Sequence, residues 1–260
     1  MRSCGGQEKT ESIQYIANAG VLVELGGKKI LIDALTKSKV PMFKSTPEVV
    51  YQQLLKQEPP YNPIDFLLVT HQHSDHFDAE RVLAFLRSSQ RTKIVAPEEV
   101  IASLRKEAPD ISTERLYGMN PALGQSETIY LEGLRIKGMA MQHEGEREIE
   151  ILHLAYLIDG GKKVMHLGDA APRQENFHLF RLKEEAVDVL LANFPYAGIP
   201  KARQLVREFI APKKMAAIHL PDPDKDRWGW IKATQKSYQR SKEDFVKTVF
   251  LKETGDRIEI

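Results

Sequence analysis

Four side chains that commonly bind metal ions lie within six positions of this 260-residue chain. They are His71, His73, Asp75 and His76, in the run HQHSDH. His71 and His73 are two residues apart, so in extended backbone their rings project to the same side and can reach one metal ion. Asp75 and His76 point elsewhere, which suits a second ion that accepts carboxylate and imidazole, such as zinc, manganese or iron. Without a cation these four groups would repel one another or demand desolvation, so we predict a metal site here.

The only cysteine of the sequence is Cys4, so the chain can form no internal disulfide and no cysteine-based zinc cluster. Cys4 lies in Ser3-Cys4-Gly5-Gly6, which is typical of the site where an exported lipoprotein is cut and lipidated, but no apolar segment precedes it. We interpret residues 1–12 as a disordered tail with an incidental thiol. The sequence does not decide where the protein is located. It could be cytoplasmic, or it could lie in the cell envelope or periplasm if a signal before Cys4 was removed.

The composition favours a single compact domain over residues 13–260. Lysine and arginine number 37 against 36 acidic residues, and the net charge of +1 provides no overall field that would attract nucleic acid or an anionic membrane. The longest apolar runs are far shorter than the roughly 20 residues that span a bilayer. We therefore expect a small-molecule substrate, no nucleic-acid partner and no transmembrane segment, with the oligomeric state open.

Short β-rich runs open the domain at residues 13–16, 21–25 and 29–32, with turn signals between them, and predict an antiparallel meander. The continuous apolar run at 66–69 predicts a strand that is buried on both faces, and the histidine run starts where it ends. Asp78 is a plausible N-cap for the helix that follows. The four metal-binding side chains are thus expected in a strand-to-helix loop.

Further strands and helices alternate along the rest of the chain, which predicts a layered α/β arrangement with helices on the outer faces of the sheets. A hairpin is predicted over 128–141, and three later strands each end near a residue that could bind a metal. The other predicted strands are 93–96, 153–158, 163–167, 187–191 and 215–218, and the predicted helices are 47–56, 98–106 and 203–210.

The histidine run resembles the HxHxDH signature of the metallo-β-lactamase superfamily, in which isolated ligands follow far along the chain. The later ligands map to His143 in Met141-Gln142-His143, to Asp169 in Leu167-Gly168-Asp169 and to His219 in Ala217-Ile218-His219. Residues 18–33 are also similar to the superfamily's opening meander. Within the superfamily, the pattern looks most like the branch of L-ascorbate-6-phosphate lactonase and the N-acylphosphatidylethanolamine phospholipase D enzymes.

This resemblance implies a four-layered αββα sandwich with two divalent metal ions, zinc first and manganese or iron as alternatives. Metal one would take His71, His73 and His143, and metal two would take Asp75, His76 and His219. Asp169 would bridge the two metals. Asp75 and Asp169 would be the catalytic residues. A metal-bridged hydroxide would then attack a small ester, lactone, amide or thioester. The alternatives are hydrolysis of a small or lipid phosphodiester, and a sulfur dioxygenase with a single iron.

The sequence leaves the roles of several nearby residues open. Asp33 either supports the metal-binding loop or caps a turn, and His166 either contacts the site or is a satisfied sheet histidine. Trp228 and Trp230 could line the pocket mouth, although tryptophans more often pack. The charged run at 144–150 is a solvated loop or a lid. His153 and His178 have no positional support in the sequence and are left out of the predicted site.

Overall fold

The computed structural model describes residues 11–145 and 151–260, so most of the predicted tail and charged run lie outside the described residues. The described strands form two seven-stranded sheets. The first sheet has the order β14-β1-β2-β3-β4-β5-β6. Its strands are β1 (Ser12–Ala17), β2 (Gly20–Leu25), β3 (Lys28–Ile32), β4 (Phe66–Leu68), β5 (Lys93–Pro97), β6 (Leu116–Met119) and β14 (Arg257–Glu259).

The second sheet has the order β13-β12-β11-β10-β9-β8-β7. The predicted meander β1–β3 and the predicted hairpin β7–β8 are both antiparallel and are confirmed, whereas β10, β11 and β12 run parallel to one another. The strands of this sheet are β7 (Ser126–Leu131), β8 (Leu134–Ala140), β9 (Leu154–Asp159), β10 (Lys163–His166), β11 (Val189–Asn193), β12 (Lys214–Ile218) and β13 (Thr248–Phe250).

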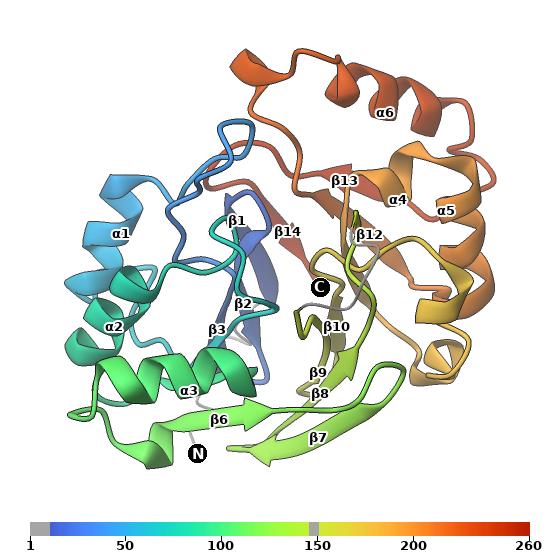
Figure 1. The fold of residues 1–260 in the computed structure, drawn as a ribbon. Coiled ribbons are helices and arrows are strands. Elements are labelled where there is room, and N and C mark those ends of the chain that lie inside the picture. Colours follow the sequence, from blue (N-terminus) through green and yellow to red (C-terminus); the bar gives the residue numbers. More distant parts are fainter. Residues whose placement is uncertain (1–10, 146–150) are drawn as a thin grey trace, which may run out of the picture.

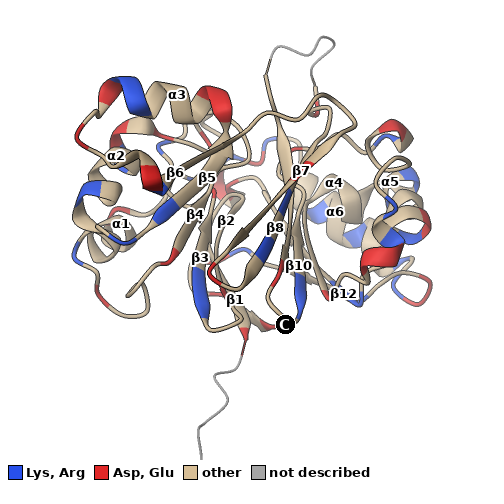
Figure 2. Cartoon of the chain, turned by 90° about the horizontal axis from the view of Figure 1, so that it is seen from below, with Lys and Arg blue, Asp and Glu red and all other residues tan. Residues whose placement is uncertain are grey.

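Helices cover the outer face of each sheet, which confirms the four-layered αββα sandwich (Figures 1 and 2). Charged residues of both signs are spread along these outer helices (Figure 2). No helix in the described ranges is both long and apolar enough to span a bilayer. The helices are α1 (Glu48–Leu55), α2 (Ala79–Ser88) and α3 (Glu98–Glu107) on the first sheet and α4 (Pro195–Gly198), α5 (Pro200–Leu205), a π-helical turn (Val206–Ile210) and α6 (Trp230–Gln239) on the second. Short 3₁₀ helices are Thr113–Arg115, Gln174–Asn176, Leu182–Glu185 and Pro223–Lys225.

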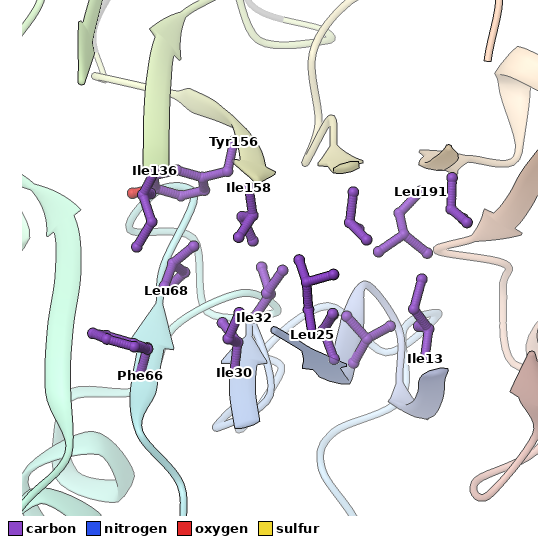
Figure 3. Packing of buried hydrophobic residues seen from close by; sticks show 14 of the residues in the cluster. Ile13, Leu25, Ile30, Ile32, Phe66, Leu68, Ile136, Tyr156, Ile158 and Leu191 are labelled. Carbon is purple, nitrogen blue, oxygen red and sulfur yellow. The ribbon is translucent and has the colours of Figure 1, made fainter. Parts of the chain in front are cut away.

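The layers are held together by three apolar clusters, one between the sheets and one beneath each set of helices. Between the sheets, Ile13 and Ile32 of the first sheet face Ile136 and Leu191 of the second, and all four are fully buried (Figure 3). Alternate residues of β3 contact the two different clusters, because successive side chains of a strand point to opposite faces. β4 is buried on both faces, as its continuous apolar run predicts.

The two sheets present the carboxyl ends of β4, β8, β10 and β12 at one edge of the sandwich. β4 is parallel to its neighbours, and β8 has the same direction as β10 because β9 is antiparallel to both. The loops after these four strands carry all the predicted metal-binding residues. The fold therefore gathers residues that are far apart in sequence at one place.

Candidate metal centre

The loop after β4 is tightened by backbone hydrogen bonds that turn its histidines inward. The N–H groups of His76 and Phe77 both donate to the carbonyl of His73, at 2.9 and 2.8 Å. The side chain of Asp78 then accepts from the backbone N–H of Arg81 at 3.0 Å, so Asp78 is the N-cap of α2, as predicted. The loop is thus held between a buried strand and a capped helix.

The structure brings His71, His73 and His143 together as a first group of potential metal ligands. His71 Nε2 lies 3.1 Å from His73 Nδ1 and 3.2 Å from His143 Nε2. One ligand atom from each residue lies within 4.8 Å of the other two. His143 enters from the second sheet, where its backbone forms an isolated bridge with Ala170.

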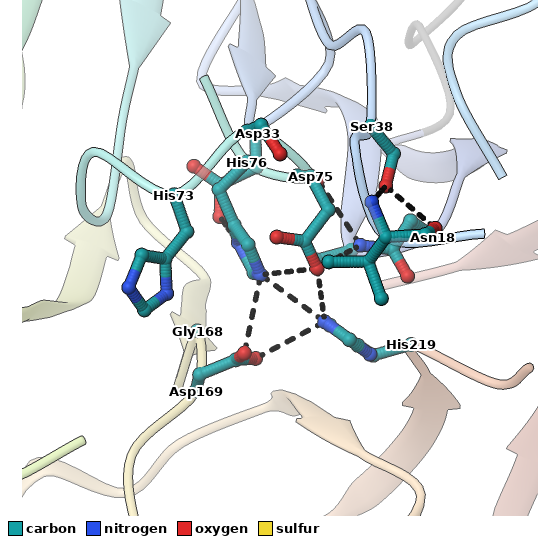
Figure 4. A network of polar contacts seen from close by, with 12 residues as sticks. Asn18, Asp33, Ser38, His73, Asp75, His76, Gly168, Asp169 and His219 are labelled. Atoms are coloured by element: carbon teal, nitrogen blue, oxygen red, sulfur yellow. Dashed lines mark hydrogen bonds and ion pairs between the residues drawn. The ribbon is translucent and has the colours of Figure 1, made fainter. Parts of the chain in front are cut away.

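Asp75, His76, Asp169 and His219 form a second group under the same distance limit (Figure 4). His219 Nε2 lies 3.1 Å from His76 Nε2 and 3.3 Å from Asp75 Oδ2. Asn18 orients the aspartate, because its Nδ2 donates to the backbone carbonyl of Asp75 at 3.0 Å and lies 3.3 Å from Asp75 Oδ2. All seven residues predicted as ligands therefore lie in two adjacent groups.

Asp169 reaches both groups. Its Oδ2 lies 3.3 Å from His76 Nε2 and 3.6 Å from His143 Nε2, and its Oδ1 lies 3.4 Å from His219 Nε2. Oδ1 is buried, and the described residues give it no hydrogen bond of good geometry. A buried carboxylate oxygen left in this state is unfavourable unless a cation or another donor satisfies it.

The rings of His71 and His76 are oriented by one buried carboxylate, that of Asp33. His76 Nδ1 lies 2.7 Å from Asp33 Oδ2, and the hydroxyl of Thr70 donates to the same oxygen at 2.7 Å. The Thr70 hydroxyl hydrogen is already used in this bond. In the 2.9 Å hydrogen bond between His71 Nδ1 and Thr70 Oγ1, the ring N–H of His71 is therefore the donor. Both rings therefore keep a hydrogen on Nδ1 and turn Nε2 toward the centre. The geometry favours the supporting role for Asp33.

His143 is oriented in the same way, since its Nδ1 lies 2.5 Å from the backbone carbonyl of Glu144, which can only accept. The Nε2 lone pair of His143 consequently faces the lone pair of His71 at 3.2 Å. Two lone pairs at this separation repel unless a cation lies between them. This donor set of imidazole and carboxylate, with Asp169 Oδ1 unsatisfied, fits a divalent transition metal.

Burial and mutual charge shift the pKa values across the centre. Burial lowers the pKa of His71 well below its usual value, which keeps the ring neutral. Burial alone would also lower the pKa of His219, but the carboxylates of Asp169 and Asp75 raise it to about 9. Burial would also lower the pKa of His76, but Asp169 and Asp33 raise it well above its usual value. In return, His219 and His76 hold the pKa of Asp169 well below its usual range despite its burial. The second group therefore attracts positive charge, whether protons or a metal ion.

His153, which has no positional support in the sequence, is buried behind the first group, with its ring centroid 5.2 Å from that of His71 and 5.7 Å from that of His143. Its Nε2 accepts from the backbone N–H of Asp169 at 3.0 Å, and its Nδ1 lies 3.3 Å from the carbonyl of Met141. Burial lowers its pKa to about 3, so it stays neutral. Strand pairing explains its position: His153 directly precedes β9, which is antiparallel to β10, so it lies at the edge where β10 ends.

The structure also places the other residues whose roles the sequence left undecided. His166 is buried and satisfied, because its Nε2 lies 2.9 Å from the carbonyl of Ala19 and its Nδ1 accepts from Gly168 N–H. His178 is exposed. Trp228 and Trp230 stack on one another with ring centroids 4.9 Å apart, and only Trp230 lines the cavity.

A cavity of about 770 Å³ opens beside the two groups. Its walls come from α4, α6 and the loops after β3, β11 and β12, and most of their side chains are apolar or aromatic. Residues of both predicted metal groups, including His73, Asp75, His143, Asp169 and His219, line the cavity. A substrate in the cavity would therefore lie directly against the metal centre.

Two archaeal proteins are similar to this chain over most of their length. A UPF0173 protein of Pyrococcus furiosus is 26% identical over 207 residues, which cover 80% of this chain and 82% of that protein. A UPF0173 metal-dependent hydrolase of Pyrococcus abyssi is 24% identical over 252 residues, with 95% and 99% coverage.

The fold is also similar to that of Igni18, a metallo hydrolase from Ignicoccus hospitalis, with a TM-score of 0.62 at 19% identity and coverage of 97% of this chain and 99% of that one. The family profile described as Beta-lactamase superfamily domain matches residues 28–205. Because this match spans well over half of the sequence, and the two sheets and their helices have the corresponding fold, the chain belongs to the metallo-β-lactamase superfamily.

Proposed function

We propose that this protein is a metal-dependent hydrolase with two divalent cations, zinc first and manganese or iron as alternatives. His71, His73 and His143 would hold one cation, and Asp75, His76 and His219 the other. Asp169, which contacts histidines of both groups, would be shared. The observation that carries the proposal is this pair of donor groups, joined by one carboxylate, in the wall of a large cavity.

When bound, the cations would lower the pKa of a water and polarise the substrate's carbonyl oxygen. The chain's own task is to hold the donors in place. Asp33 and the carbonyl of Glu144 orient three of the imidazoles, and Asn18 holds Asp75. Fixed donors of this kind need no reorganisation during the reaction, which is the main way a preorganised site lowers a barrier.

The cavity favours a neutral carbonyl substrate, namely an ester, lactone, amide or thioester. None of the described residues that line it is a lysine or an arginine, and Phe43, Phe194, Ile199 and Trp230 provide an apolar wall. A phosphodiester or phosphorylated sugar would normally meet a cationic side chain as well as the metals. The phosphodiesterase, the sulfur dioxygenase and the lactonase or phospholipase branch have no comparable support in this site.

Metal analysis and a substrate panel test the proposal. Protein purified without added metal should contain two transition-metal ions per chain. A panel of aryl ester, aryl lactone, thioester and bis(p-nitrophenyl) phosphate should show turnover of the carbonyl substrates well above that of the phosphodiester. One iron per chain with oxygen uptake, or turnover of the phosphodiester alone, would contradict the proposal.

A further inference from the structure

We propose that Asn193 selects the substrate, by accepting a hydrogen bond from an N–H group of a neutral molecule that carries an apolar arm. The inference rests on the proposed function, because it names the substrate class of the same site. Asn193 is the last residue of β11, and its partner on β12 is Ile218, which immediately precedes His219. Strand pairing therefore places Asn193 next to the metal centre, where it lines the cavity.

The side chain of Asn193 is 5% exposed, and its Oδ1 accepts no hydrogen bond from the described residues. Asn176, a buried asparagine that does not line this cavity, has hydrogen-bond partners for both its amide oxygen and its amide nitrogen. Its Oδ1 accepts from Gln142 N–H at 2.7 Å, and its Nδ2 donates to the carbonyls of Gln142 and Ala171 at 2.8 and 2.9 Å. A buried amide oxygen without a donor is unfavourable, so a donor from outside the fold would gain from meeting Asn193.

The surroundings of Asn193 define the rest of the ligand. Next in sequence, Phe194 stacks on Trp230 with ring centroids 5.7 Å apart, and Trp230 stacks on Trp228, which is 64% exposed. An apolar surface thus continues from the cavity wall to the outside of the molecule. This wall favours an aryl or alkyl arm, because burying apolar area is the main source of affinity in such pockets.

The charge of the lining residues disfavours a negatively charged arm. The described acidic residues of the cavity are Asp75, Glu144 and Asp169, and no described lysine or arginine balances them. The ligand class is therefore a neutral ester or amide with an apolar arm and a secondary amide near the reacting carbonyl.

A pair of probes tests this selection through binding and not through turnover. N-acetyl-phenylalaninamide presents the aromatic arm and the acetamide N–H, and its analogue with CH₂ in place of that N–H lacks only the donor. We expect the metal-loaded full chain to bind the N–H probe about tenfold more tightly, measured by tryptophan fluorescence and calorimetry, because a site built around a hydrogen bond rejects the analogue without it.

Three variants complete the test. Asn193→Leu should bind the two probes equally, and Asn193→Asp should keep the preference, because a carboxylate still accepts. Ser237→Ala is the matched control in the same cavity, since Ser237 Oγ already donates to the carbonyl of Gly198 at 2.6 Å. Its preference should equal that of the wild type.

Equal binding of the two probes by the wild type, or an unchanged preference in Asn193→Leu, would overturn the role of Asn193. The wild-type comparison decides the matter even if Asn193→Leu fails to fold. A clear preference in binding with no turnover of any panel substrate would refute the hydrolase and leave the selection by Asn193 intact. Turnover of a panel substrate with no preference between the probes would refute the role of Asn193 and leave the hydrolase intact.

Discussion

The side chain of Asp169 holds the two donor groups together, since its Oδ2 lies within 3.6 Å of His143 Nε2 and 3.3 Å of His76 Nε2. Asp169→Asn keeps the size of the side chain and removes its charge. We expect the variant to lose at least one metal ion. Its kcat/KM on the best panel substrate should fall by about 100-fold or more, because loss of even an outer-shell partner costs about 10- to 100-fold.

Metal content by mass spectrometry and initial rates measure this effect. Asp110→Asn is the control, because Asp110 forms an exposed ion pair with Arg87 and is not among the residues that line the cavity. An Asp169→Asn protein with two ions and full turnover would be incompatible with a shared carboxylate.

His153 is predicted to act as a positioning residue for Asp169. In His153→Phe the backbone N–H of Asp169 loses its acceptor, so the loop after β10 is free to shift. We expect metal affinity to fall by about 10- to 100-fold, as for other outer-shell partners. The control is His178→Phe, on the exposed surface. If competition with a fluorescent chelator gives the same metal affinity for both variants, the positioning role is wrong.

Residue types and spacing reveal different parts of this site to different degrees. The run from His71 to His76 is visible because four metal-binding types occur within six positions. His143, Asp169 and His219 are single residues after strands, and only their order along the chain, compared with a known family, singles them out. His153 and Asn193 depend on which strands pair, and no local pattern records that pairing.

At the scale of elements, α2 anchors the loop that carries the first four donors. Asp78→Ala removes its N-cap, and we expect the free energy of unfolding to fall by about 1 kcal/mol in urea titrations. Asp78→Asn retains a capping oxygen, so its free energy of unfolding should fall by only a small part of this amount. Metal content should remain at the wild-type level in both. A loss of metal from Asp78→Asn as well would point to a ligand role for Asp78.

Elements with strong local signals were predicted, and those that depend on distant partners were not. β1 to β3 are separated by turns that mark their ends, and α2 has a cap and an apolar stripe. β14 becomes a strand by pairing with β1, with Ser12 opposite Glu259, across almost the whole chain. Three-residue strands such as β13 and β14 offer too few positions for a periodicity to appear.

At the scale of the whole molecule, the candidate metal centre joins the two sheets. Loops of the first sheet contribute His71 to His76, and loops of the second contribute His143, Asp169 and His219. A ligand that binds only the folded state stabilises it, so metal should raise the Tm of the entire domain in one transition. The size of that effect depends on pH, because protons and metal ions compete for the same imidazoles.

The sign of this dependence follows from the raised pKa values of the second group. In the metal-free protein, the folded-state pKa of His219 is about 9 and that of His76 is also raised, so protonation of both stabilises the fold. This stabilisation is complete below pH 6.5, the usual histidine value, and is lost as pH rises through 9. His71 and His153, whose pKa values are lowered, are neutral in both folded and unfolded states above pH 7 and add nothing in this range.

The increase in Tm caused by metal should therefore widen between pH 7 and pH 9. The metal-free fold weakens over this range, whereas metal binding strengthens because fewer protons must leave the imidazoles. Thermal unfolding of chelator-treated protein and of protein with stoichiometric zinc at pH 7, 8 and 9 measures the difference. His219→Asn lacks the group with the pKa near 9 and should show a smaller widening. A constant difference in the wild type would mean that His219 and His76 do not exchange protons for metal, and would remove them from the second metal site.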